Sequence, residues 1–251
     1  MDRVRTSRSS AARGAGTIGA TCAVAGSALL LVGTWLHPLD ADPNDALAAF
    51  TEYAADRLWY ASHLMQLAGV AAIVAALLLL GRRLDVGRGA LWSRLAAAGA
   101  VASLASAAAL QAVDGVALKR MVDAWAAASM PEKAAWFAAA FAVRQVEIGL
   151  ASMASLVFGA TAALYGVALL VDGRHPAWLG AVAVAGGAAT VVAGVVIATT
   201  GFSALAMAID MPATLLLLAW LLLIARRMWR DGAPSFEPGD PLERSAREDA
   251  S

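Results

Sequence analysis

Residues 58–80 read LWYASHLMQLAGVAAIVAALLLL, a run without a single Asp, Glu, Lys or Arg. About twenty consecutive apolar residues allow an α-helix to cross the hydrocarbon core of a bilayer, and this run has that length. A segment in lipid must satisfy its backbone polar groups internally, so the run predicts a transmembrane helix. It also carries His63, and an ionisable side chain inside a span is paired, hydrated or functional.

Five further runs of the same kind make this a multi-pass membrane protein. They lie at 17–36, 95–117, 147–171, 177–200 and 211–229. Hydrophobic residues make up 60% of the 251-residue chain, compared with about 45–50% in soluble proteins. We therefore predict an all-α, polytopic bundle of six transmembrane helices whose main partner is the lipid bilayer.

The charged residues are distributed unevenly along the chain. The 19 Lys and Arg balance the 19 Asp and Glu, so no basic excess indicates nucleic-acid binding. With a cytoplasmic amino terminus, the cytoplasmic segments hold 14 of the 19 Lys and Arg; the others are Arg57, Lys119, Arg120, Lys133 and Arg144. The positive-inside rule then places both termini in the cytoplasm.

The chain divides into a basic cytoplasmic tail at 1–16, a transmembrane domain at 17–230 and a charged, proline-containing tail at 231–251 that is predicted to be disordered. Within the domain, Asp42 followed by Pro43 predicts the start of a short interfacial helix.

Two helix boundaries in the second half are open to alternatives. Ser129-Met130-Pro131-Glu132 reads as a capping box that opens a helix. That helix runs unbroken to about 171 or breaks near Arg144; we prefer a separate amphipathic first part in the interface. Residues 201–212, which end in Pro212, are the best candidate for an unwound stretch before the sixth span.

Hydrogen-bonding and charged side chains gather toward the outer ends of the spans. They are His37, His63, Gln111, Asp114, Arg144, Glu147 and Asp210. Arg144 and Glu147 are three residues apart and share a helix face. One interpretation is an outward-opening ligand site formed by His63, Asp114, Arg144, Glu147 and Asp210. The alternative, which we favour, is that Arg144 pairs with Glu147 or Asp114 and holds helices together.

The two histidines suggest two cofactor hypotheses, neither of which becomes a prediction. His37 and His63 could ligate a haem iron, or a divalent metal together with Asp114 or Glu147. Neither histidine belongs to a ligand pair within one helix, such as H-x-x-x-H, so we expect hydrogen-bonded interfacial histidines and no cofactor. Motifs for hydrolase, nucleotide-binding or zinc-protease sites are absent from the sequence, and no catalytic residue is predicted.

Small residues recur four apart in three spans. The rows are Gly99, Ser103 and Ala107; Ser155, Gly159 and Ala163; and Gly186, Thr190, Gly194 and Ala198. Such rows let helix backbones approach closely. They predict packing within the bundle, with a homodimer through one of these faces as the alternative.

The last third of the chain resembles a known family. Residues 174–180, RHPAWLG, precede the fifth span, and Met211-Pro212-Ala213 leads into the sixth. Over about residues 160–230 this pattern resembles the bacterial multi-pass membrane proteins catalogued as domain of unknown function 4386. The resemblance implies a six-span helical fold in the inner (plasma) membrane of a bacterial cell, and it implies no activity and no functional residue.

Three functional classes remain open. The leading interpretation is an accessory or structural membrane protein, which predicts that the polar residues pair fully and leave no cavity. The second is a transporter or binder of a small molecule or lipid, which predicts a cavity reaching the membrane midplane. The least favoured is an intramembrane enzyme or redox protein, which predicts that His63, Asp114 and Glu147 converge in an apolar pocket.

Overall fold

The computed structural model describes the backbone of residues 2–232 and the side chains of residues 14–230, and this part of the chain contains helices and no strand. The helices are α1 (Asp2–Leu36), α2 (Ala46–Ala55), α3 (Trp59–Leu84), α4 (Ala90–Gln111), the π-helix η1 (Ala112–Leu118), α5 (Lys119–Ala127), α6 (Lys133–Asp172), α7 (Ala177–Thr200) and α8 (Ala204–Gly232). The tail predicted at 231–251 lies outside the described residues, apart from the end of α8.

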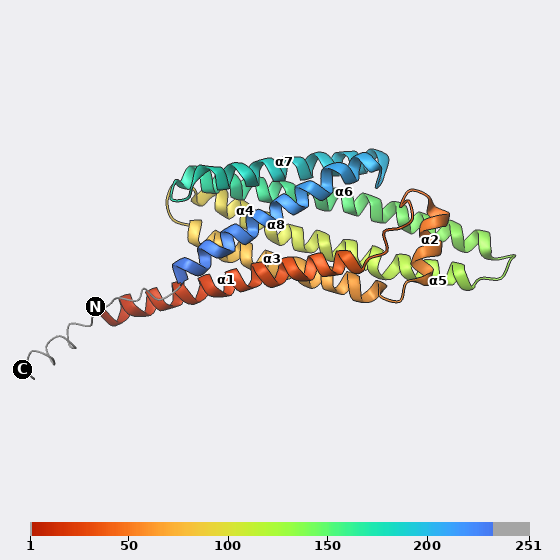
Figure 1. Cartoon of the computed structure of the whole chain (residues 1–251), viewed down its shortest axis with the longest axis horizontal. Helices are drawn as coiled ribbons and strands as arrows, with labels where there is room; N and C mark the ends of the chain where they lie inside the picture. The colour runs from red at the N-terminus through yellow and green to blue at the C-terminus, as the bar shows by residue number, and fades with distance from the viewer. Residues whose placement is uncertain (1, 233–251) are drawn as a thin grey trace, which may run out of the picture.

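Six helical segments have the length and apolar composition of membrane spans, as expected for a multi-pass membrane protein. They are Gly14–Leu36, Trp59–Leu84, Ala90–Ala127, Lys133–Asp172, Ala177–Thr200 and Ala204–Arg230. Each corresponds to one predicted span. The start of α1 and the end of α8 lie at one end of the bundle, and α2 crosses the other (Figure 1).

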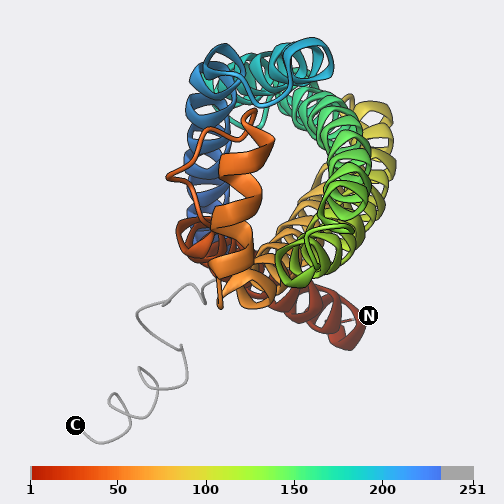
Figure 2. The same cartoon turned by 90° about the vertical axis from the view of Figure 1, so that its right-hand side faces the viewer.

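The spans form a closed ring. Each packs against its neighbours in the order α1, α3, α4, α6, α7 and α8, and α8 returns to contact α1. Figure 2 shows this ring end-on, with α2 lying across it. In a regular ring of six, opposite helix axes lie roughly 16–20 Å apart, which exceeds the roughly 10–12 Å diameter of one helix. The architecture therefore leaves a central space between the helix axes, and side chains of all six spans project into it.

Small residues hold the ring together where α6 meets α7. A Cβ added to Gly159 would lie 2.5 Å from the carbonyl oxygen of Gly187, and one added to Gly187 would lie 2.4 Å from that of Gly159. Only glycine allows this approach. The small-residue rows of α6 and α7 therefore pack against other helices of the same chain, as predicted for packing within the bundle.

Two predicted boundaries in the second half of the chain were wrong. α6 is a single helix from Lys133 to Asp172 and does not break at Arg144. The span that was expected at 211–229 begins at Ala204, and Pro212 lies inside it. The side chain of Ser203 accepts a hydrogen bond from the Ala206 amide at 3.2 Å, so a serine cap starts this helix well before the proline.

The interfacial helix is present, but its start was also misplaced. Asp45, not Asp42, is the cap of α2, and its carboxylate accepts hydrogen bonds from the amides of Leu47 and Ala48. The third span does not end at 117, because η1 and α5 extend it without interruption to Ala127. Consequently α5 and the first part of α6 project past the other spans and provide the surface on which α2 packs (Figure 1).

Candidate functional site

Asp114 lies in η1, where the third span changes from an α-helix to a π-helix. Short π-helical turns inside α-helices are frequent at functional sites. The indole of Trp59 donates a hydrogen bond to the Gly115 carbonyl at 3.1 Å, which fixes α3 against η1. A Cβ at Gly115 would lie 2.9 Å from the Cβ of His63, so the glycine is what lets His63 lie beside Asp114.

His63 is buried, and its hydrogen bonds determine its tautomer. Its Nδ1 lies 2.7 Å from the Trp59 carbonyl oxygen, which can only accept, and 3.1 Å from the Ser62 hydroxyl, which itself donates to that carbonyl, so Nδ1 carries a proton. In the neutral ring, Nε2 then presents a lone pair. That Nε2 lies 3.1 Å from Oδ2 of Asp114, whose other oxygen, Oδ1, is buried without a hydrogen-bond partner among the described residues.

His37 follows the end of α1 and completes a group of three. Its Nδ1 lies 2.8 Å from the Pro38 carbonyl oxygen and donates to it, which leaves Nε2 unprotonated in the neutral ring. One ring nitrogen of each histidine and one oxygen of Asp114 all lie within 4.8 Å of one another. Burial lowers the pKa of His37 from its ordinary value, which favours the neutral ring, although Asp114 opposes this shift.

Aromatic rings from α2 and α3 surround the histidines. Trp59 stacks on His63 at a centroid distance of 4.5 Å, and Tyr53 contacts Trp59 at 4.7 Å. Burial raises the pKa of Tyr53 to about 12, so its hydroxyl is neutral at physiological pH. The rings of His37 and His63 are 5.1 Å apart and contact each other. This is unlike bis-histidine haem, in which the two rings lie on opposite faces of a porphyrin.

Arg144 and Glu147 form a buried ion pair next to this group. Nη1 of Arg144 donates to both carboxylate oxygens of Glu147, at 2.7 and 2.6 Å, and the side chains are 6% and 3% exposed. Nη2 donates to the Pro43 carbonyl, and the guanidinium lies 4.9 Å from the ring centre of Phe202. Arg144 thus connects α6 to the segment before α2 and to the turn between α7 and α8. Its partner is Glu147, and it bonds no oxygen of Asp114.

A buried lysine attaches α2 to the rest of the site. Lys119 is 5% exposed, and its Nζ donates to the carbonyls of Tyr53 and Ala54, at 2.8 and 3.3 Å. These are carbonyls of the last turn of α2, where a positive charge is favourable. Nζ also pairs with Asp123 at 2.8 Å. Sequence reasoning treated Lys119 as an ordinary outer-loop charge, because nothing local shows that α2 folds over it.

Asp210 does not join this group. It lies on α8, half-buried, and among the described residues none forms a hydrogen bond or ion pair with it. It lines a cavity of about 360 Å³ at the centre of the ring, which receives side chains from all six spans. The cavity extends from Gln66 to Leu77 on α3, about 16 Å along the helix, and so reaches the middle of that span.

The walls of the cavity are largely apolar, but two buried polar atoms there have no partner among the described residues. They are Nε1 of Trp220, whose side chain is 3% exposed, and Oε1 of Gln111. The Gln111 amide nitrogen is satisfied by Oε1 of Gln66 at 3.0 Å. An unpaired buried polar group costs about 1–3 kcal/mol, so the cavity offers one donor and one acceptor to a ligand.

Of the five predicted site residues, four therefore lie together. His63, Asp114, Arg144 and Glu147 form one electrostatically coupled cluster with His37, and Asp210 belongs to the cavity instead. Four further residues of the cluster and the cavity were not predicted from the sequence: Tyr53, Trp59, Lys119 and Trp220. Of these four, only Trp59 could have been predicted from the local sequence. It lies four residues before His63, and that spacing places both side chains on one helix face.

Comparison of the chain with protein-family models, curated proteins and solved structures finds no match in any of the three.

Proposed function

We propose that the protein binds a small, mainly apolar, lipid-soluble molecule in the central cavity of its helix ring. The observation that carries the proposal is the indole N–H of Trp220, which has no partner among the described residues and is buried in the wall of a cavity of about 360 Å³. Ligand pockets are typically apolar and about 300–1,000 Å³, with few polar groups that orient the ligand. This cavity has room for about a dozen groups the size of a water molecule.

The polar atoms of the cavity define the chemistry of the ligand. Trp220 requires an acceptor, and Gln111 Oε1 requires a donor. A hydroxyl group satisfies either, so a long-chain alcohol is the simplest molecule of this class. We therefore favour a binder of a small molecule or lipid, the second of the three functional classes, because a purely structural bundle was expected to leave no cavity.

Binding is favoured over transport. A transport pathway would be helped by an unwound span, but α8 is helical through Pro212 and from Ala204 onward. We therefore propose a membrane-embedded receptor or carrier of a ligand that enters from lipid. On the positive-inside rule, α2 and the polar cluster lie on the side of the membrane away from the cytoplasm. The resemblance to a bacterial family implies that this is the inner membrane of a bacterial cell.

The test uses a long-chain alcohol with bromine at its far end, because bromine quenches tryptophan fluorescence on contact. In detergent-purified protein, we expect that part of the quenching saturates as the probe concentration rises. The Trp220→Phe variant should lack this saturable part. Ala154→Phe fills the cavity and should abolish this fraction, because Ala154 is a buried residue of its wall. The matched control is Ala160→Phe, on the exposed face of the same helix, which should leave it intact.

Equal saturable quenching in the Ala154 and Ala160 variants would contradict the proposal. So would quenching that rises linearly with probe concentration in the unmodified protein, because that reports only partition into the detergent.

A further inference from the structure

We propose that His37, His63 and Asp114 form a binding site for a divalent transition-metal ion of the zinc type. Two imidazole nitrogens and one carboxylate oxygen are the donor set of many open metal sites, which keep the remaining positions for water or substrate. The donors come from three separate segments: the end of α1, the first turns of α3, and η1. Because the donors lie far apart in the sequence, no sequence motif predicts this site.

Both histidines are oriented as metal ligands are. In metal sites, the ring nitrogen that does not bind the ion donates its proton to a carbonyl or carboxylate, which sets the tautomer and the ring direction. His63 donates from Nδ1 to the Trp59 carbonyl, and His37 donates from Nδ1 to the Pro38 carbonyl. Each ring therefore offers Nε2, and its direction is set before any ion binds.

When Nδ1 of His63 carries its proton, the contact of Nε2 with the Asp114 carboxylate needs a second proton or a metal ion between the two atoms. Nε2 of the neutral histidine and Oδ2 of the carboxylate are both acceptors, yet they lie 3.1 Å apart. Either a shared proton or a metal ion resolves this contact. Two ligand atoms in a tetrahedral site at 2.0–2.1 Å from the ion lie about 3.3 Å apart, so the observed separation already suits a metal.

The surroundings favour a cation. With neutral histidines, the cluster carries two carboxylates against one guanidinium, and Arg144 is committed to Glu147. Among the residues that the structure describes, none bonds the Oδ1 of Asp114. One ring nitrogen of each histidine and one Asp114 oxygen lie within 4.8 Å of one another, whereas donors of a tetrahedral zinc lie about 3.3 Å apart, so binding requires the widest pair to close by up to about 1.5 Å.

The experiment measures metal content. Detergent-purified full-length protein is stripped with a chelator, equilibrated separately with Zn²⁺, Co²⁺, Fe²⁺ and Mn²⁺, freed of unbound metal and analysed by mass spectrometry. We expect about one zinc or cobalt ion per chain, and a visible cobalt absorption spectrum typical of nitrogen and oxygen ligands. His63→Gln and Asp114→Asn should each weaken binding by at least about 100-fold, since removal of outer partners alone costs 10–100-fold.

The control variant is His175→Gln, which removes the one other histidine, in the turn between α6 and α7. It should bind zinc as the unmodified protein does. Because Asp114→Asn keeps the shape of the side chain, it guards against loss of binding by misfolding, and its thermal stability without metal is measured in parallel. No bound ion in the unmodified protein, or equal binding by the His63 and His175 variants, would overturn the proposal and assign the contact to a shared proton. Neither result bears on the proposed binding of a ligand in the central cavity.

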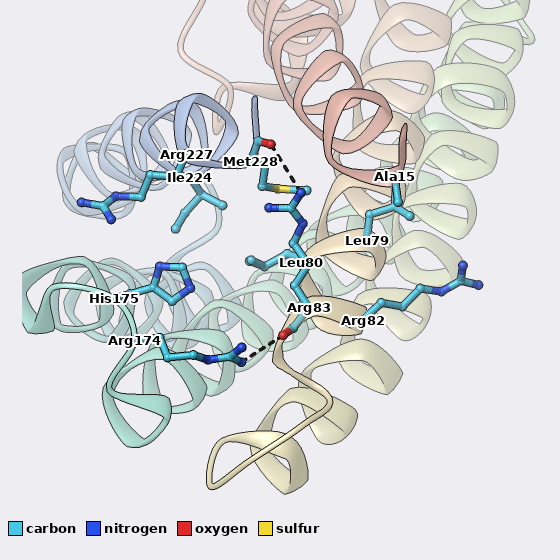
Figure 3. Close-up of a pocket in the computed structure, with 10 residues that line it drawn as sticks. All are labelled: Ala15, Leu79, Leu80, Arg82, Arg83, Arg174, His175, Ile224, Arg227 and Met228. Atoms are coloured by element: carbon cyan, nitrogen blue, oxygen red, sulfur yellow. Dashed lines mark hydrogen bonds between the residues drawn. The ribbon is translucent and has the colours of Figure 1, made fainter. Parts of the chain in front are cut away.

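A different observation, at the opposite end of the ring, carries a second inference. A pocket of about 540 Å³ lies among the ends of α1, α3 and α8 and the turn before α7, and four arginines line it: Arg82, Arg83, Arg174 and Arg227 (Figure 3). Arg174 donates to the Arg83 carbonyl at 3.0 Å and to Asp172, so its position is fixed. Apolar side chains, among them Leu80 and Ile224, form the rest of the lining.

We infer that this pocket binds the phosphate of an anionic phospholipid. Arginine guanidinium groups match phosphate oxygens geometrically, and basic pockets between transmembrane helices on the cytoplasmic side bind acidic headgroups. The apolar lining would accept the start of an acyl chain, which free phosphate lacks. Both ligands share the same anionic group, so the test must separate them.

The test compares thermal stability of the protein in detergent with added phosphatidylglycerol, phosphatidylcholine or inorganic phosphate. We expect saturable stabilisation by phosphatidylglycerol alone, lost in the Arg82→Gln, Arg227→Gln double variant. Arg88→Gln, at an exposed position on the same end but outside the pocket, should retain it. Equal effects of the two lipids, stabilisation by inorganic phosphate instead, or equal loss in the Arg88 variant would overturn the inference.

Discussion

The buried pair of Arg144 and Glu147 gives the sharpest prediction about stability. Arg144→Ala removes the guanidinium and leaves the Glu147 carboxylate, 3% exposed, without its two hydrogen bonds. Breaking a buried ion pair from one side costs roughly 3–5 kcal/mol, because the remaining charge is uncompensated. Arg120 on α5 is exposed, and replacing such a surface residue usually changes stability by at most about 0.5 kcal/mol.

The assay is thermal unfolding in detergent, followed by the fraction of protein that stays monodisperse after heating. For a chain of this size, 1 kcal/mol corresponds to about 2–4 °C, so Arg144→Ala should lower the midpoint by roughly 6–20 °C. Arg120→Ala should lower it by no more than about 2 °C. Equal shifts for the two variants would refute the reasoning.

A double variant separates the charge from the packing. Replacing both Arg144 and Glu147 with methionine removes the uncompensated charge, so most of the lost stability should return. Recovery will be incomplete, because the hydrogen bond to the Pro43 carbonyl and the contact with Phe202 are also lost. If the double variant is no more stable than Arg144→Ala, the pair does not stabilise the fold by charge compensation.

Three further predictions concern close packing and the attachment of α2. Gly115→Ala should displace His63 and weaken zinc binding at least tenfold, because the new Cβ would lie 2.9 Å from the Cβ of that histidine. Gly159→Ala should lower the unfolding temperature by forcing α6 and α7 apart, whereas Gly149→Ala, where a Cβ meets nothing within 4 Å, should not; both are checked by the same melting assay. Lys119→Met should speed amide hydrogen exchange throughout α2 by removing the donors to its last carbonyls, and unchanged exchange would show that α2 is held by its aromatic contacts alone.

The sequence by itself determined that this chain has six apolar helices, because span length and hydropathy are sums over neighbouring residues. It also predicted the depth of His63, Asp114, Arg144 and Glu147, since depth follows from the number of residues to the end of a span. The pairing of Arg144 with Glu147 followed from their spacing on one helix.

Only the tertiary structure decided which of these residues meet. The π-helix at 112–118 adds about one residue to a turn, and each residue turns the side-chain direction by about 100°, so Asp114 faces His63 through a distortion that no hydropathy pattern reveals. The separation of Asp210 and the burial of Lys119 depend on which helices become neighbours in the ring. Those neighbours are set by close backbone contacts between residues in different helices, such as Gly159 with Gly187. No single stretch of the sequence can therefore predict them.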